Sequence, residues 1–234
     1  MLPRSPYAQT LFWLDLRSTL RQRFRTCYSR HTWEAARMRA EVFIVESLGA
    51  NDEREGKILR SILRMGRKSP VYRYVKTKEG LEDAIAEFHA SDYRYLHISS
   101  HGNSREFCFQ FGALKFKDFA DLLRDKLRHR RLFVSACECV NSTFAELLIP
   151  SSKCYSIIGP YEAIDFDVAA ILWAAYYYFA FRNDQQSMNR RKIVRRLERL
   201  SRVFRVNLNY YSESRERIKR KRFVGRTGKS QKGA

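Results

Sequence analysis

The sequence has few prolines and glycines, no long apolar run and an odd number of cysteines. Five prolines and ten glycines in 234 residues exclude collagen-like and low-complexity chains. The longest apolar stretch, 168–181, is shorter than the roughly 20 residues that span a bilayer. Five unevenly spaced cysteines argue against a disulfide scaffold, and the N-terminus lacks an apolar segment with a small-residue cleavage site. We therefore expect a cytoplasmic protein without a membrane span.

Acidic residues are scarce at both ends of the chain. Residues 1–40 contain eight Arg and two acids, and residues 182–234 contain 18 basic residues and four acids, whereas 41–181 contain 19 of each. The formal net charge of +20 therefore lies in the two ends. A neutral, well-patterned centre between basic segments indicates a folded module with an interaction surface or solvated tails.

Short apolar segments rich in β-branched residues alternate with segments of helical periodicity. This alternation predicts an α/β fold with a mostly parallel sheet. The predicted strands cover 41–46, 71–75, 93–98, 132–134 and 155–158, with a hairpin over 107–116, and the predicted helices cover 52–65, 78–89, 118–128, 141–148 and 168–181.

The basic ends are expected to lie outside this central unit. We predict a mainly helical N-terminal segment over 1–40, a main domain over 41–181 and a basic helical extension over 182–222. The extension includes a helix over 189–204. The remaining residues, 223–234, are polar and basic, and we expect them to be disordered.

Two predicted strands end in residues with reactive side chains. One strand runs into Ser99-Ser100-His101-Gly102, and the next predicted strand runs into Ser135-Ala136-Cys137. Ligands and reactive groups gather at the carboxyl ends of strands in open parallel sheets. An imidazole beside a thiol increases its thiolate fraction and makes it a useful nucleophile. The sequence therefore predicts a Cys-His dyad, if these strands are neighbours.

Simpler interpretations remain open. A single histidine or cysteine at a strand end is usually just packed in the core. A zinc site made of His97, His101, Cys137 and Cys139 is disfavoured because residues four apart on a strand stand about 13 Å apart. We therefore expect no zinc site.

The motifs and their order resemble a known family. His101-Gly102 after one strand, Ser-Ala-Cys137 after the next, and Ile-Gly-Pro160 with Ile164-Asp165 before an apolar helix resemble the caspase-like cysteine peptidases, in particular the CHAT domain group. The resemblance covers 41–181 and implies a caspase-like three-layer α/β/α sandwich. The caspase signature itself is not met, because Glu138-Cys139 follow the cysteine.

The resemblance also implies residue roles. His101 would act as base and acid, Cys137 would be the nucleophile, and the backbone N–H groups of Gly102 and Cys137 would form the oxyanion hole of an endopeptidase. Such an enzyme would need no metal and no organic cofactor. Asp165 and Asp167 are the candidates for receiving a basic substrate side chain. An acidic residue before an apolar helix is also an ordinary N-cap, and that alternative stays open.

The expected partners are a protein or peptide substrate and a regulatory partner protein. The second hypothesis is a non-catalytic basic adaptor with a caspase-like fold that binds nucleic acid or a partner protein. No zinc-finger, RNP or helix-turn-helix signature accompanies the charge. The basic C-terminal segment therefore predicts only non-specific phosphate contacts.

Overall fold

The computed structural model describes residues 38–183, 189–214 and 217–225. Their strands form one nine-stranded sheet. The elements, in chain order, are β1 (Arg39–Ser47), α2 (Glu55–Met65), β2 (Val71–Tyr74), α3 (Lys78–Ala90), β3 (Tyr93–Gly102), β4 (Glu106–Phe109), β5 (Gly112–Lys115), α4 (Phe116–Leu122), β6 (Arg131–Ser135), α5 (Ser142–Ser152), β7 (Ser156–Pro160), α6 (Phe166–Asn183), α7 (Arg190–Phe204), β8 (Leu208–Ser214) and β9 (Arg217–Phe223).

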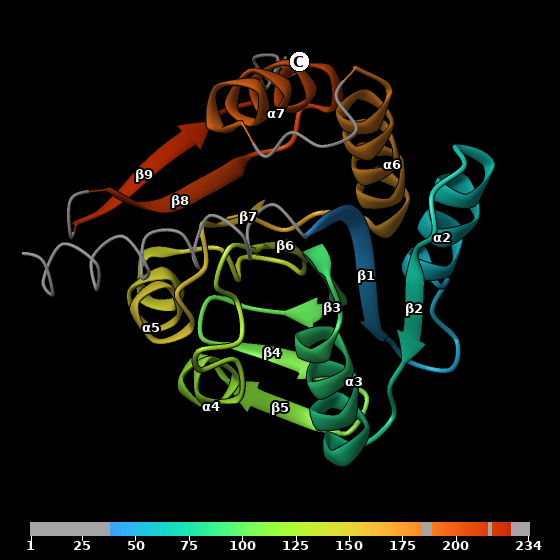
Figure 1. Ribbon diagram of the computed structural model, residues 1–234, viewed down its shortest axis with the longest axis vertical. Helices are drawn as coiled ribbons and strands as arrows, with labels where there is room; N and C mark the ends of the chain where they lie inside the picture. Colours follow the sequence, from blue (N-terminus) through green and yellow to red (C-terminus); the bar gives the residue numbers. More distant parts are fainter. Residues whose placement is uncertain (1–37, 184–188, 215–216, 226–234) are drawn as a thin grey trace, which may run out of the picture. The chain divides into compact units, whose positions relative to one another are not determined.

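The sheet has the strand order β2-β1-β3-β6-β7-β8-β9 (Figure 1). The first five strands in this order pair in parallel, whereas β8 and β9 join antiparallel to β7 and to each other. The hairpin of β4 and β5 extends from the end of β3. The predicted hairpin around Gly112 is confirmed.

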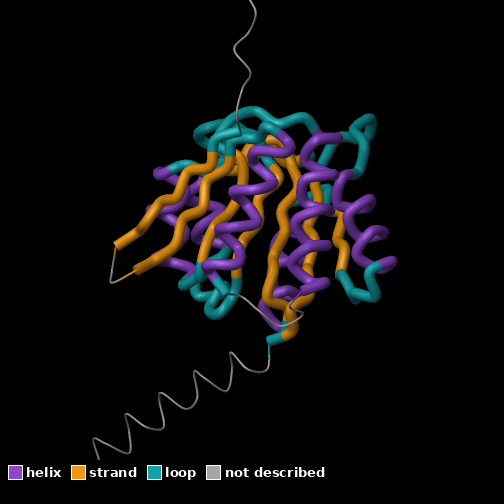
Figure 2. The backbone as a smooth tube through the Cα atoms, turned by 90° about the horizontal axis from the view of Figure 1, so that it is seen from above, coloured by secondary structure: helices purple, strands orange, loops and turns teal. Residues whose placement is uncertain are grey.

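Helices cover both faces of the sheet. The alternating side chains of β1 supply both cores, with Phe43 and Val45 on one face and Val42 and Ile44 on the other. Helices α3, α4 and α5 pack on the first face, and α2, α6 and α7 pack on the second (Figure 1). Strands buried on both faces read as continuous apolar runs. The predicted α/β fold is confirmed, and the loops gather at the two edges where the strands end (Figure 2).

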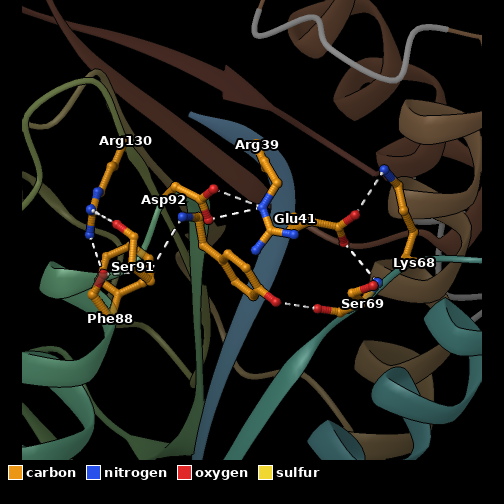
Figure 3. A network of polar contacts seen from close by, with 9 residues as sticks. Arg39, Glu41, Lys68, Ser69, Phe88, Ser91, Asp92 and Arg130 are labelled. Atoms are coloured by element: carbon orange, nitrogen blue, oxygen red, sulfur yellow. Dashed lines mark hydrogen bonds and ion pairs between the residues drawn. The ribbon is translucent and has the colours of Figure 1, made fainter. Parts of the chain in front are cut away.

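A polar network closes the edge at which β1 and β3 begin (Figure 3). Arg39 Nε pairs with Asp92 Oδ2 at 2.8 Å. Glu41 accepts hydrogen bonds from Lys68 Nζ and from the backbone N–H of Ser69. These contacts tie the start of β1 to the segments that precede β2 and β3.

Arg130 completes this edge from the start of β6. Its buried guanidinium donates to the carbonyl oxygens of Phe88, His89 and Ser91, where α3 ends. The carbonyl end of a helix favours a cation. Burial lowers the pKa of Arg130 to about 10, so the side chain stays charged near neutral pH.

The prediction of a helix over 118–128 is wrong in its second half. Helix α4 ends at Leu122, and the backbone N–H groups of Asp125 and Leu127 donate to the carbonyls of Ser151 and Ser152. These bonds to the end of α5 replace the helical i to i−4 bonds. Asp125 adopts a positive φ of 58°, which a continuing helix does not allow.

The prediction of a helical extension over 182–222 is also corrected. Residues 190–204 are helical, but 208–214 and 217–223 are strands β8 and β9. Tyr210 and Tyr211 are buried in the two opposite cores, and Tyr211 pairs with Ile157 of β7. Alternate burial on both faces favours a strand over a helix. A boundary at residue 181 is therefore wrong, because β8 and β9 extend the same sheet.

The two predicted terminal segments lie largely outside the described residues. Arg39 and Ala40 begin β1 rather than ending a helical segment, and 1–37 are outside the description. Phe223, the first residue of the predicted tail, is buried at the end of β9, whereas 226–234 are not described. In the described ranges, no helix combines the length and apolar character needed to cross a membrane.

Helix α7 contributes to the core, and this placement is testable. Leu197 is fully buried, whereas Val203 of the same helix is 72% exposed. We expect Leu197→Ala to lower the free energy of unfolding by about 2 to 5 kcal/mol and Val203→Ala to change it by less than about 0.5 kcal/mol. Urea unfolding measures both. Equal small effects would mean that α7 does not share the core of the sheet.

Candidate active site

Strands β3 and β6 are neighbours, and their register places His101 and Cys137 at one edge. Ser99 pairs with Ser135 at the end of the parallel ladder. His101 and Cys137 each follow two residues later in their strands' direction. Parallel strands end at the same edge of a sheet, so the two residues extend from adjacent strands at equivalent positions.

The imidazole of His101 contacts a carboxylate, that of Asp52, which was not predicted from the sequence. His101 Nε2 lies 2.9 Å from Asp52 Oδ2, and the ring packs edge-on against Phe166 with centroids 5.0 Å apart. Asp52 also accepts a hydrogen bond from the backbone N–H of Gly49. The hydrogen bond from His101, and then that from Gly49, lower the pKa of Asp52. The sequence offered one indication of this contact, the location of Asp52 after β1, because β1 is a neighbour of β3 in the sheet.

The thiol of Cys137 faces a different segment. Its Sγ lies 3.6 Å from the carbonyl oxygen of Ile164 and 3.5 Å from the backbone nitrogen of the same residue. Among the described residues, the imidazole and the thiol are not hydrogen-bonded to each other. Catalytic hydrogen bonds are often long before substrate binds. Residues 164–166 contact both groups, because Ile164 holds the thiol and Phe166 covers the imidazole.

A sharp turn follows Cys137. Glu138 has a φ of 59°, a left-handed conformation that is uncommon for residues other than glycine. Its backbone N–H donates to the carbonyl of Glu162 at 3.3 Å. Unusual backbone conformations are often found at functional sites. The turn ends β6 and directs the chain toward α5.

Gly102 allows the end of β3 to approach this turn closely. A Cβ atom on Gly102 would lie 2.3 Å from Cys139 Sγ and 3.3 Å from the carbonyl oxygen of Cys137. Cys139 is buried, its Sγ donates to the carbonyls of Asn103 and Glu106, and burial raises the pKa of its thiol. The structure therefore explains this glycine by packing against Cys139.

A second thiol lies beside the imidazole. Cys108 of β4 is the cross-strand partner of His101, and directly opposed side chains in antiparallel strands lie about 5 Å apart at Cβ. Cys108 is half-buried. Burial, and then the charge of Glu106, raise the pKa of its thiol. This neighbour of His101 was not predicted from the sequence, because the pairing of β4 with the end of β3 is a tertiary feature.

Two buried carboxylates lie beneath this edge. Glu55 Oε2 accepts hydrogen bonds from the hydroxyls of Ser135 at 2.8 Å and Ser99 at 3.1 Å. Glu46 accepts from the backbone N–H of Gly56 and from the Tyr72 hydroxyl. These bonds fasten the start of α2 to the ends of β1, β3 and β6. They thereby fix the end of the loop that carries Asp52.

His97 is part of this buried group rather than of the exposed edge. It is fully buried, its Nδ1 lies 3.2 Å from the Tyr177 hydroxyl, and its Nε2 lies 3.7 Å from Glu55 Oε1. Within the described part of the chain, no group of three or more His, Cys, Asp or Glu side chains is arranged to hold a metal ion.

Asp165 and Asp167 are both exposed at the start of α6. The backbone carbonyl of Asp165 accepts from the N–H of Ala169, and Asp167 Oδ1 accepts from the N–H of Val168. Acidic side chains are favourable in the first turn of a helix. Asp165 stands between Ile164 and Phe166, the residues that contact the thiol and the imidazole, so it belongs to the same edge.

Comparisons with known proteins do not identify a family. No family model and no curated protein match the chain. Among solved structures, the chain is similar to the crystal structure of protein GSU0716 from Geobacter sulfurreducens, with 10% sequence identity and a TM-score of 0.41. The similarity covers 81% of this chain and 95% of that chain.

The close approach at Gly102 predicts a specific double-mutant result. Gly102→Ala forces the new methyl group against Cys139 Sγ, and overpacking of this kind costs about 1 to 3 kcal/mol. Removing the sulfur with Cys139→Ala in the same chain makes room for the methyl group. We expect urea unfolding to show that the double variant is more stable than the sum of the single changes predicts. Strict additivity would contradict the contact.

The buried carboxylate of Glu46 predicts a pH-dependent stability. Burial raises the pKa of Glu46 above its ordinary value of 4.5. The folded protein therefore binds the carboxyl proton of Glu46 more tightly than the unfolded chain does. The stabilisation that this proton gives is present at low pH and is lost as the pH rises through the raised pKa. Glu46→Gln removes this titration. Urea unfolding at a series of pH values measures the effect, and we expect the stability of the variant relative to the native protein to improve as the pH rises above 4.5. A pH-independent difference would contradict this.

Proposed function

We propose that the protein is a cysteine endopeptidase of the caspase-like type, with Cys137 as nucleophile and His101 as general base and acid. The observation that carries the proposal is the register of β3 and β6. It places His101 and Cys137 two residues beyond the paired Ser99 and Ser135. The helices on both faces of the sheet are compatible with a caspase-like three-layer sandwich.

Asp52 supports a defined role for the imidazole. A proton on Nε2 of His101 is held by the Asp52 carboxylate at 2.9 Å. The other ring nitrogen, Nδ1, is then unprotonated and free to accept a proton. A nucleophile, a base and a group that orients the base are the components of activated cysteine and serine sites. Asp52 is therefore proposed as a positioning residue for His101.

The proposed reaction proceeds in two stages. His101 takes the proton of the Cys137 thiol, and the thiolate attacks the carbonyl carbon of a peptide bond. The tetrahedral oxyanion accepts hydrogen bonds from the backbone N–H groups of Gly102 and Cys137. His101 then gives its proton to the leaving amine, which breaks the C–N bond. Water, deprotonated by His101, hydrolyses the thioester and frees Cys137.

Substrate binding and control are proposed for the segment that follows β7. Asp165 and Asp167 are exposed and would receive a basic side chain of the peptide substrate. Ile164 engages the Cys137 thiol through its backbone, so this contact has to open before the thiol attacks. A regulatory partner protein that moves residues 164–166 would control the enzyme.

A covalent probe tests the dyad. We expect a peptide acyloxymethyl ketone with arginine at P1 to add one adduct to the native protein, located on Cys137 by intact mass and peptide mapping. Cys137→Ala abolishes the adduct. His101→Ala slows its formation about 100-fold or more, because general-base assistance is lost. Asp52→Asn is also expected to slow the formation of the adduct. Raising the pH is expected to restore part of the labelling rate of this variant, because Asp52 acts through the imidazole.

Cys108→Ala is the matched control, because it removes the other thiol beside His101. We expect this variant to be labelled at the native rate. An adduct on Cys108, or labelling of Cys137 at the same rate with and without His101, would contradict the proposed dyad.

A further inference from the structure

The C-terminal part of the sheet has a strongly basic exposed surface. Residues 189–214 and 217–225 contain 13 Arg and Lys and only two Glu. The outer strand β9 contributes five of these basic residues, all exposed, within seven positions: Arg217, Lys219, Arg220, Lys221 and Arg222.

Helix α7 and one side of the β8–β9 ribbon lie next to each other, and both carry exposed basic residues. Lys221 pairs across the strands with Tyr210 and Lys219 with Ser212. Tyr210 belongs to the core beneath α7, and the guanidinium of Arg190, at the start of α7, lies 5.8 Å from the centre of its ring. Lys219 and Lys221 therefore lie on the side of the ribbon that α7 covers.

Within residues 189–214 and 217–225, acidic side chains do not neutralise this surface. Glu198 of α7 pairs with Arg202, and Glu213 is the cross-strand partner of Ile218, which faces the opposite core. Among the described residues, none of the five basic side chains of β9 forms an ion pair. Their charges are available to an external anion.

The spacing of the charges favours a linear polyanion. On the side of the ribbon that faces α7, β9 presents Arg217, Lys219 and Lys221, whereas Arg220 and Arg222 face the opposite side. Side chains on one face of a strand are about 6.6 Å apart, so this side carries about one positive charge per two phosphate steps. Each strand of a nucleic acid duplex carries one phosphate per about 3.4 Å of its length. On α7, Arg191, Arg195 and Arg199 are exposed and repeat every four residues, about 6 Å along the axis.

The surface offers phosphate contacts rather than base contacts. The aromatic residues on this side of the ribbon, Tyr210 and Phe223, are buried and cannot stack on bases. Arg and Lys contacts to phosphate position a nucleic acid without reading its sequence. Binding through this surface would depend on salt and hardly on sequence.

We propose that the basic side chains of β9 on the side of the ribbon that faces α7, together with the outer face of α7, bind the phosphate backbone of nucleic acid. The chemistry is shared by single-stranded and double-stranded forms. This binding is independent of the Cys137 chemistry, because the basic residues lie on β9 and α7 and the dyad lies at the ends of β3 and β6.

The test measures the salt dependence of binding. Fluorescence anisotropy with a fluorescein-labelled 20-base-pair DNA duplex, and with a 20-nucleotide single strand, gives Kd between 50 and 200 mM NaCl. Each lost phosphate contact lowers the steepness of log K against log [salt] by about 0.9 for a duplex and about 0.7 for a single strand. Lys219→Gln/Lys221→Gln is expected to weaken binding. The loss of two phosphate contacts lowers the steepness of log K against log [salt] by about 1.8 for the duplex.

Lys57→Gln/Lys115→Gln is the matched control. It removes the same charge from two exposed lysines on α2 and β5, and we expect a native slope. Cys137→Ala is also expected to bind as the native chain does. Urea unfolding verifies that each variant is folded.

Three results would overturn the proposal. The first is an unchanged slope in Lys219→Gln/Lys221→Gln, and the second is an equal loss in both double variants, which would reflect net charge alone. The third is the absence of oligonucleotide binding together with binding to phosphatidylserine vesicles, which would assign the surface to an anionic membrane.

Discussion

Five residue pairs, from Tyr95 with Arg131 to Ser99 with Ser135, fix β3 and β6 in parallel register. A shift of one residue would turn the side chains of β6 to the opposite face of the sheet. Phe133 would leave the core beneath α6, and Cys137 would lose its place beside the end of β3. The apolar pattern of both buried strands therefore fixes the geometry of the candidate site as well as the fold.

The buried carboxylates beneath the edge extend this constraint to a third strand. A buried charge without hydrogen-bond partners is costly. Glu55 accepts hydrogen bonds from two serine hydroxyls, and Glu46 accepts them from the N–H of Gly56 and the hydroxyl of Tyr72. These partners come from α2, β2, β3 and β6, so the two carboxylates connect elements that are distant in sequence. The loop ahead of Glu55 is thereby fixed at one end, and its Asp52 reaches His101. The candidate site is exposed to solvent, and the polar layer that supports it is buried.

The outer end of the sheet has a different physical character. Strand β9 pairs with β8 only, which leaves one side of its backbone unpaired within the described residues. Exposed edge strands are prone to pair with other chains, and charged side chains along them oppose this. The same basic residues that protect the edge supply the density of charge from which nucleic acid binding is proposed. One strand can serve both purposes because each requires only exposed positive charge.

Local sequence patterns predicted the alternation of strands and helices, the hairpin around Gly112 and the two strand ends that carry His101 and Cys137. Local periodicity and strand-end motifs are properties of short segments and are therefore visible in the sequence. The other neighbours of His101 and the C-terminal strands depend on tertiary contacts. Asp52 and Cys108 reach His101 only through strand pairing and a loop anchored by Glu55, and the basic residues after Tyr211 form a strand because β7 and β8 offer an edge to pair with. The helix predicted over 118–128 ends at Leu122 because the end of α5 provides competing carbonyl groups. Contacts between segments distant in sequence leave no local pattern, and those contacts placed the side chains around the candidate site.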